Sequence, residues 1–569
     1  MNIHMKKVIQ NIVAKELNKL GYSGIEFSVE EPPDGKMGDY ASNAALKAAG
    51  KAKQSPKELA ETLAKALKKP DMFESVKVLG PGFLNFTVAG KVLVETLQRV
   101  NQKKDKYGNS SVGKNIKVLV EYFQPNIAKP LHLGHLRTAI IGDAIFRILQ
   151  FVGYKVESDT HIGDWGTQFG LLLYAYKQWR KDTVIEKSPF KELNELYVRI
   201  NKEVEKNPEL QEQGKAEFLK LEQGDKENRR LWKRFVEQSF LEFEKVYSLL
   251  GIRKHDHNWP ESFYEDKMSE VIKSLQTRGL LKKSQGAKIV DLEPYKLGTA
   301  IIIKSDGGTT YLLRDLATFM FRKSKKFSQQ LYVVDVRQEH AFNQTFKILE
   351  LLGHIKSPSE AVHVSYGFLS TEEGIFSTRK GNSVGPVELI EQAESKVLEI
   401  IKEKNPDLKN QAEVARSVAV GAIKYFDLSH NRASNVVFRW DEVLDFEGNS
   451  GPYLQYAHAR IRSILRKAGK TASADNLETL IKPEERRLLV RLTRFSETVE
   501  LAATNYMPHF IAEYLYKLAG EFNQFYQNVR VLDESDRKVR TARLALVLAV
   551  AHVLKNGLNL LGIEAPEEM

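Results

Sequence analysis

Two histidines three residues apart, His132 and His135, flank Gly134 and closely follow Lys129. Imidazole and ammonium groups donate hydrogen bonds to phosphate oxygens, and a glycine lets a ligand approach the backbone. Such a pair also occurs as half of a metal site or as ordinary packing. The metal interpretation is weaker, because the chain has no cysteine, no glutamate separates the histidines and their spacing is not His-x-x-x-His. The residue types alone leave phosphate binding and packing open.

The elements around these residues have the order strand, loop, helix. Residues 116–120 are a short, mostly apolar run typical of a buried strand, and Pro125 and Pro130 interrupt regular structure after it. From Gly134 to about residue 152, apolar residues recur with helical spacing. In an open α/β sheet this order puts the loop at the carboxyl end of a strand, where free amides at the helix start favour an anion. We expect a phosphate group there.

Further strand-like runs predict the rest of the sheet. Asp164 and Gln338 directly follow two of them, Asp315 lies in a helix that opens after a third, and Lys380 lies in a basic loop after the last. Strand followed by helix, repeated, predicts the α/β class with a doubly wound parallel, Rossmann-type sheet, whose ligands bind at the carboxyl edge. The predicted strands are residues 116–120, 155–163, 300–304, 330–336 and 361–368.

The flanking regions have other patterns. Short strands mixed with helices at the amino end predict a small α+β domain, and long helical periodicities at the carboxyl end predict an all-α bundle. Aromatic residues in segments 80–86 and 446–462 either pack locally or stack on unpaired bases. The expected domains are an amino-terminal domain at 1–112, a catalytic domain at 113–385 with a helical insertion at about 176–285, a connection at 386–411 and a helical domain at 412–569.

The composition limits the class of protein. A chain of 569 residues with 42% hydrophobic residues can form two to four domains. The net charge of +12 suits a polyanion such as RNA, although charge alone is weak support. The absence of cysteine excludes disulfides and agrees with a reducing compartment. Since the amino end resembles an amphipathic helix and no apolar run approaches the roughly 20 residues of a spanning helix, we expect a cytoplasmic protein without a membrane segment.

The chain resembles the class I aminoacyl-tRNA synthetases. The string from His132 to His135 is similar to their His-Ile-Gly-His signature, and the basic loop with Lys380, about 245 residues later, to their Lys-Met-Ser-Lys-Ser signature. Four longer strings, spread over most of the chain in the family's order, resemble arginyl-tRNA synthetase in particular. They are residues 125–135, 162–170, 377–381 and 451–460.

The resemblance implies a two-step reaction. ATP, accompanied by Mg²⁺, would activate L-arginine to arginyl-adenylate with release of pyrophosphate, and the arginine would then pass to the 3′-terminal adenosine of tRNA(Arg). It implies no structural metal, no DNA or membrane partner, and a monomer. The implied catalytic residues are Lys129, His132, His135 and Lys380, and the implied ATP-binding residues are these four with Gly134, Gly163 and Asp164.

A guanidinium group is best bound by carboxylates, because they match its fork of donors. The resemblance assigns arginine binding to Glu121, Asn126, His132, Tyr311, Asp315 and Gln338. It assigns tRNA contacts to Phe83, Asn85, Tyr453 and Met569. Many relatives carry Ser or Asn where this chain has Gln124, so that contact is not carried over. A structural alternative for Asp315 is an ion pair with Arg314 or a cap of the helix.

Other functions remain open from the sequence. A class I synthetase for cysteine should carry Cys and His zinc ligands, and a small-molecule adenylyltransferase should lack the carboxy-terminal bundle. A synthetase-like RNA-binding protein should have a damaged first signature, whereas His132, Gly134 and His135 are all present.

Overall fold

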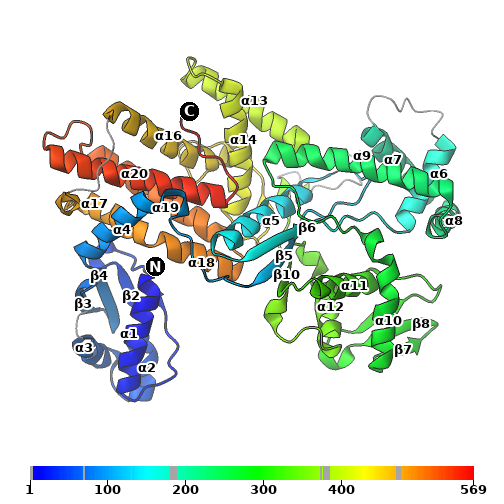
Figure 1. The fold of residues 1–569 in the computed structure, drawn as a ribbon, viewed down its shortest axis with the longest axis horizontal. Coiled ribbons are helices and arrows are strands. Elements are labelled where there is room, and N and C mark those ends of the chain that lie inside the picture. Colours follow the sequence, from blue (N-terminus) through cyan, green and yellow to red (C-terminus); the bar gives the residue numbers. More distant parts are fainter. Residues whose placement is uncertain are drawn as a thin grey trace. The chain divides into compact units, whose positions relative to one another are not determined.

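The computed structural model describes residues 4–67, 71–129, 131–179, 189–371, 374–375, 385–469 and 476–569. The chain forms two compact units (Figure 1). The first contains Met1–Ser110, Glu403–Ser417 and Asp445–Met569, and the second contains Ser111–Lys402 and Val418–Leu444. This division differs from the expected one, in which the helical domain began at 412.

The difference has a local cause. The strand β14 (Val436–Val437) pairs in parallel with β12 (Leu369–Thr371), which also pairs with β13 (Gly374–Ile375). A strand of two residues is too short to leave a periodic signal in the sequence, so the helical pattern around it was the only one detectable.

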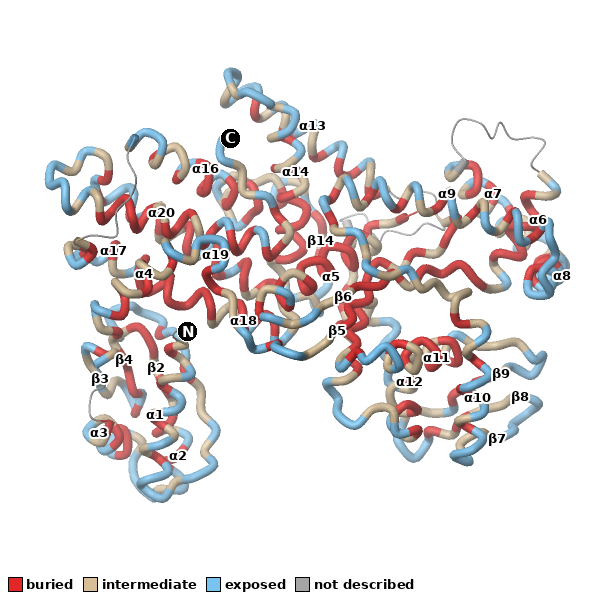
Figure 2. Tube along the Cα trace, in the orientation of Figure 1, coloured by how far each residue is buried: buried red, intermediate tan, exposed pale blue. Residues whose placement is uncertain are grey.

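The second unit is built on a parallel sheet. Its strands and the helices between them are β5 (Lys117–Glu121), α5 (Leu133–Phe151), β6 (Lys155–Asp159), α11 (Tyr311–Ser324), β10 (Gln329–Tyr332), α12 (Glu339–Leu351) and β11 (Ala361–His363). The strand order is β11-β10-β5-β6. The core of β5, Val118 to Val120, is buried, and Figure 2 draws this strand in red.

The sheet is doubly wound, as predicted. The chain leaves β5 through α5 to reach β6 on one side, and later enters β10 on the other side of β5. The strand order therefore reverses between β5 and β10, and in such sheets the ligand crevice lies at the carboxyl ends of the strands at this point. Glu121 is paired with Tyr332 of β10 and with Asp159 of β6, so these three strands end at the same level.

Helices and a separate small sheet occupy the chain between β6 and α11. These elements are α6 (Thr167–Trp179), α7 (Pro189–Lys206), α8 (Leu210–Glu222), α9 (Lys226–Leu250), the 3₁₀ segment η4 (Glu261–Lys267), α10 (Met268–Thr277), β7 (Leu281–Ser284), β8 (Ala287–Asp291) and β9 (Thr299–Ile303).

The prediction that residues 300–304 resume the parallel sheet is wrong. β9 pairs with β8 in the antiparallel sheet β7-β8-β9. Its side chains alternate, with Ala300 and Ile302 buried and Thr299 and Ile301 exposed. Alternation of this kind is typical of an antiparallel strand with one face in water, whereas a strand inside a doubly wound sheet is covered on both faces.

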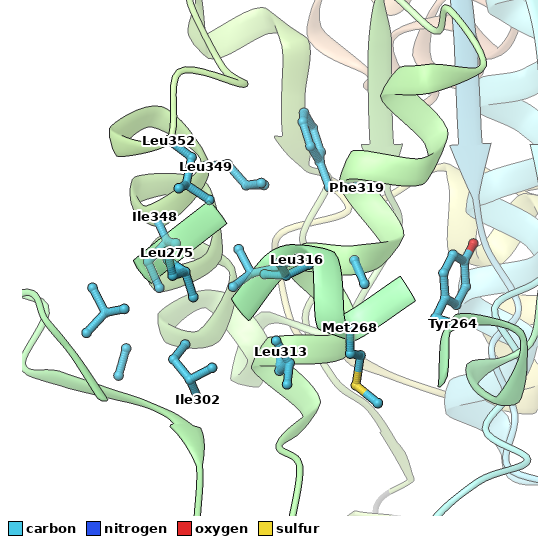
Figure 3. Close-up of a cluster of buried hydrophobic side chains, with 14 of the residues drawn as sticks. Tyr264, Met268, Leu275, Ile302, Leu313, Leu316, Phe319, Ile348, Leu349 and Leu352 are labelled. Carbon is cyan, nitrogen blue, oxygen red and sulfur yellow. The ribbon is translucent and has the colours of Figure 1, made fainter. Parts of the chain in front are cut away.

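A hydrophobic cluster fixes the position of α11. Leu313, Leu316 and Phe319 of this helix are buried with Leu275 of α10 and Leu349 of α12 (Figure 3). Burial of each such side chain stabilises the fold by about 1.5–3 kcal/mol. The helix begins at Tyr311, as predicted, because the Thr310 hydroxyl accepts a hydrogen bond from the amide of Leu313.

The first unit combines a small sheet with a helical bundle. The antiparallel order β1-β2-β4-β3 confirms the predicted strands at 76–78 and 83–88. The longest helix of the bundle, α20, is apolar enough by length and composition to cross a membrane, but 78% of that window is buried, as in the core helix of a folded domain. The elements are α1 (Met5–Lys19), β1 (Val29–Glu30), β2 (Tyr40–Ser42), α2 (Ala44–Ala52), α3 (Pro56–Ala66), β3 (Phe73–Leu79), β4 (Phe83–Val88), α4 (Gly90–Lys103), α16 (Gly451–Ala468), α17 (Pro483–Thr493), α18 (Phe495–Asn505), α19 (His509–Asn528) and α20 (Arg537–Leu560).

The helices α13 (Pro386–Lys404) and α14 (Gln411–Leu428) each have residues in both units.

Candidate active site

The histidine turn caps the start of α5. Nδ1 of His132 accepts a hydrogen bond from the amide of Gly134, and Nδ1 of His135 accepts one from the amide of His132, both at 3.1 Å. The two rings lie against each other with their centroids 3.9 Å apart. Because an amide is always the donor, each Nδ1 carries no proton, and the proton of each neutral ring is on Nε2.

The surroundings keep both rings neutral. Burial, with a smaller effect of the nearby Arg337 guanidinium, lowers the pKa of His132. Burial, followed by the neighbouring His132, holds the pKa of His135 well below its usual value. At neutral pH the turn therefore presents two uncharged Nε2–H donors at the carboxyl end of β5.

Lys129 and Asn126 connect this turn to the loop after β6. The ammonium of Lys129 donates to Oε1 of Gln168 at 2.8 Å. The amide of Ile127 donates to the carbonyl oxygen of Gly163 at 3.0 Å. A Cβ on Gly163 would lie 2.0 Å from Oδ1 of Asn126, so only a glycine leaves room for this amide side chain. The structure thus brings together the loops that the sequence assigned to one ligand.

Asp164 follows Gly163 but is engaged inside the protein. Its carboxylate accepts hydrogen bonds from the amide of Ser262 at 2.8 Å and from the Ser262 hydroxyl at 2.6 Å. Burial raises its pKa to about 6. These contacts give Asp164 a structural task, which is to hold η4 beside the loop after β6.

Two carboxylates, Glu121 and Asp315, lie close enough for the charge of Glu121 to act on Asp315. Burial and the negative charge of Glu121 raise the pKa of Asp315 to about 7. Among the residues that the structure describes, none forms a hydrogen bond or an ion pair with the Asp315 side chain. Arg314 is paired with Glu261 at 3.2 Å and with Glu265 at 3.5 Å, and Thr310 caps the helix. Both structural alternatives for Asp315 are therefore wrong.

Glu121, in contrast, already has a cationic partner. Its Oε2 lies 2.5 Å from Nη1 of Arg322, and its Oε1 accepts from Nε2 of Gln124 at 3.2 Å. Sequence reasoning missed Arg322. It lies seven residues after Asp315, two helical turns, and this spacing was the signal that both face the sheet.

The remaining expected site residues are Tyr311, Gln338 and Lys380. Tyr311, at the start of α11, is 60% exposed. Gln338 is exposed and ends the 3₁₀ segment η6 (Val336–Gln338), which follows β10. The charges of Asp335 and Arg337 reach His132, which confirms that the end of β10 lies beside the histidine turn. Lys380 lies outside the described residues.

The residues assigned to tRNA lie in the first unit. Phe83 is 37% exposed, but Asn85 is buried and its amide donates to the carbonyl of Met37 at 2.7 Å. Tyr453 is half-buried, and its hydroxyl accepts from Nδ2 of Asn523 at 2.9 Å. Asn85 and Tyr453 thus both have protein partners.

Met569 lines a groove of about 720 Å³. The groove presents two aromatic rings, Tyr456 and Tyr526, which are 42% and 36% exposed. Its cationic side chains are Arg460, Arg466 and Lys467. Tyr456 lies one helical turn beyond Tyr453 in α16, within the aromatic segment that the sequence singled out.

A doubly wound sheet with a His-x-Gly-His turn at its switch point agrees with a nucleotide-binding enzyme of the class I aminoacyl-tRNA synthetase type. The family model "tRNA synthetases class I (R), catalytic domain" matches residues 96–440. Models of the "Arginyl tRNA synthetase N terminal domain" and of the "DALR anticodon binding domain" match residues 7–88 and 454–569.

The chain belongs to the arginyl-tRNA synthetase family. It is 41% identical over 570 residues to an arginine–tRNA ligase of Halothermothrix orenii, with complete coverage of both chains, and 42% identical over 567 residues to one of Clostridioides difficile, with 99% coverage of each. An arginyl-tRNA synthetase structure from Thermus thermophilus superposes with a TM-score of 0.85 at 28% identity, covering 99% of this chain and all of its own. One from Plasmodium falciparum superposes with a TM-score of 0.86 at 26% identity, covering all of both chains. The chain is thus an enzyme that uses ATP to attach arginine to tRNA, and the alternatives of another synthetase, an adenylyltransferase or a non-catalytic protein are set aside.

Proposed function

We propose that the histidine turn acts on ATP through two neutral donors. Activation of arginine is the attack of its carboxylate on the α-phosphate of ATP, so negative charge develops on phosphoryl oxygens. Nε2–H groups of His132 and His135 would donate to these oxygens. The observation that supports this most is that a backbone amide occupies Nδ1 of each ring. Lys129 would add a positive charge on the same side, and Lys380 would act on the pyrophosphate side.

Arginine is proposed to bind beside this turn. Asp315, which has a raised pKa and no partner among the described residues, would pair with the guanidinium group. Glu121 would contribute its second oxygen, and Tyr311 would cover the side chain. Asn126 and Gln338 would hold the amino and carboxylate groups near the α-phosphate. Gly134 and Gly163 would serve ATP binding indirectly, by leaving room for the side chains of His132 and Asn126.

Mg²⁺ is proposed to arrive with ATP, held by the phosphate oxygens. The described residues contain one group whose ligand atoms are close enough for a metal, formed by Glu121, Asp159 and His161. Both acids of this group, Glu121 and Asp159, pair with Arg322. A cation between them would compete with this guanidinium, so the group does not fit a metal site.

The groove lined by Met569 is proposed to receive unpaired bases of the anticodon loop. Exposed rings beside arginines give a stacking surface whose contribution is about 1–3 kcal/mol per base. Phe83 would contact tRNA from the amino-terminal domain. In filter binding, Tyr456→Ala should weaken the affinity for tRNA about 5-fold or more. Tyr295→Ala, which changes an exposed tyrosine of the second unit, is the control, and equal affinity of Tyr456→Ala and the wild type would remove this groove from the proposal.

The enzyme is further proposed to act as a cytoplasmic monomer without DNA or membrane partners. Sedimentation equilibrium at the concentration used for activity should give the mass of one chain, 64.8 kDa. The site assignment as a whole is tested by charging total tRNA with each amino acid in turn. Only arginine should be accepted, and charging with a neutral amino acid would contradict the roles of Asp315 and Glu121.

A further inference from the structure

The helix α11 carries a buried cation in addition to the proposed substrate anion. Arg322 is completely buried. Its Nη1 lies 2.5 Å from Oε2 of Glu121, and its Nη2 donates to Oδ2 of Asp159, also at 2.5 Å. A single guanidinium thus joins the last residues of the two neighbouring strands β5 and β6.

Because of this bridge, one carboxylate is left without a cationic partner and is available to a ligand. Three acids, Glu121, Asp159 and Asp315, lie at the ends of β5 and β6 and on the facing side of α11. Arg322 compensates the first two, and Arg314 is occupied by Glu261 and Glu265. Asp315 alone of the three acids has no cationic partner among the described residues.

We propose that Arg322 is a positioning residue for arginine selection: by bridging Glu121 and Asp159, it pairs with these two acids and leaves Asp315 as the carboxylate available to the substrate guanidinium. The proposal rests on the arginine site described above. Arg322 itself is not proposed to touch the substrate, because its side chain is completely buried and paired with Glu121 and Asp159.

The charge balance gives the direction of the effect. Burial and Glu121 raise the pKa of Asp315, while Arg314 and Arg322 lower it, and the result is about 7. Loss of the Arg322 charge removes a favourable partner and also leaves Glu121 uncompensated, so the pKa of Asp315 must rise. The groups that face Asp315 are Glu121 on β5, Glu261 on η4, Tyr332 on β10, and Tyr311, Arg314 and Arg322 on α11.

The test is the pH profile of kcat/KM for arginine, measured by tRNA charging between pH 6 and 9, because this profile reports groups of the free enzyme. If Arg322→Met raises the pKa of Asp315 by about one unit, the ionised fraction of Asp315 at pH 7 falls from about a half to roughly a tenth. The kcat/KM for arginine should then fall about 5-fold at pH 7, and this loss should disappear near pH 9. The kcat/KM for ATP should change less than 2-fold. The control is Lys323→Met, which removes a neighbouring cation of α11 that pairs with Glu360 and should leave the profile unchanged.

Two further variants keep the test decisive if Arg322→Met does not fold. Arg322→Lys keeps the positive charge but lacks the two-pronged guanidinium group. It should therefore shift the acid limb of the profile, which is the fall of kcat/KM at low pH, less than Arg322→Met does. Asp159→Asn removes the competing acid while its amide oxygen can still accept from the amide of Trp259. The freed charge of Arg322 should then shift the acid limb to lower pH, opposite to the shift from the loss of Arg322.

The outcomes separate this proposal from the function of the site. An unmoved acid limb in the foldable variants, or a loss of activity that is equal at every pH, would overturn the role of Arg322. A wild-type profile without any acid limb for arginine would instead count against Asp315 as the guanidinium partner.

Discussion

Replacement of His135 by alanine removes both contacts of this ring. The ring supplies a proposed Nε2–H donor to the phosphoryl oxygens and an Nδ1 acceptor for the amide of His132. Loss of one donor to a charge that develops in the transition state costs about 2.7–4 kcal/mol, or about 100- to 1000-fold in rate. Loss of the acceptor removes half of a reciprocal cap, which costs about 0.5–2 kcal/mol of stability.

The assay is ATP–pyrophosphate exchange with saturating arginine and ATP in the presence of tRNA. His135→Ala should lower the exchange rate at least ~100-fold and lower the temperature of unfolding. His135→Gln is the matched control, because glutamine at this helix position can accept the same amide and restore the cap. It should recover the stability but not the rate. Exchange at nearly the wild-type rate in His135→Ala would refute the assignment of the turn.

Three further predictions concern charge. Lys129→Ala should also lower the exchange rate at least ~100-fold, and an unchanged rate would remove this residue from the site. Arg137→Met removes a buried guanidinium that donates to Asp427 at 2.8 Å and to the carbonyl of Gly367 at 2.6 Å. Because Asp427 is then left buried without its cation, the free energy of unfolding in urea should fall by about 3–5 kcal/mol. An unchanged midpoint of unfolding would show that the ion pair contributes nothing. Burial raises the pKa of Glu497 from 4.5 to about 7, so the protonated carboxyl stabilises the folded state fully below pH 4.5, and this stability is lost as the pH rises to about 7. Glu497→Gln should therefore raise the unfolding temperature at pH 8 but not at pH 4. Equal effects at both pH values would contradict the pKa shift.

The sequence predicted the site where short-range patterns determine it. An apolar run followed by prolines and a helical period located β5, the loop and α5, and the order of elements placed Asn126 and Gln338 near one sheet edge. Asp315 was expected at the same edge on the assumption that residues 300–304 belong to the parallel sheet, which is wrong. The fold class followed from the same alternation of strand and helix. The assignment of 300–304 failed because a short strand in an antiparallel sheet and one in a parallel sheet have similar composition.

The parts that the sequence did not predict depend on contacts between distant segments. Arg322 and Asp159 are 163 residues apart, and Asp164 and Ser262 are 98 residues apart. No local period reveals such pairs, since a buried charge is recognisable only when its partner is known. Asn85 was assigned to tRNA from the family resemblance, and only the fold shows that its amide also donates to the carbonyl of Met37.

The most direct test of the site is the pair of Michaelis constants of Asp315→Asn. The KM for arginine should rise sharply, because the guanidinium loses its ionised partner. The KM for ATP should stay within about 2-fold of the wild type, because the histidine turn is untouched. An unchanged KM for arginine would contradict the claim that an acid beside the nucleotide turn selects the amino acid.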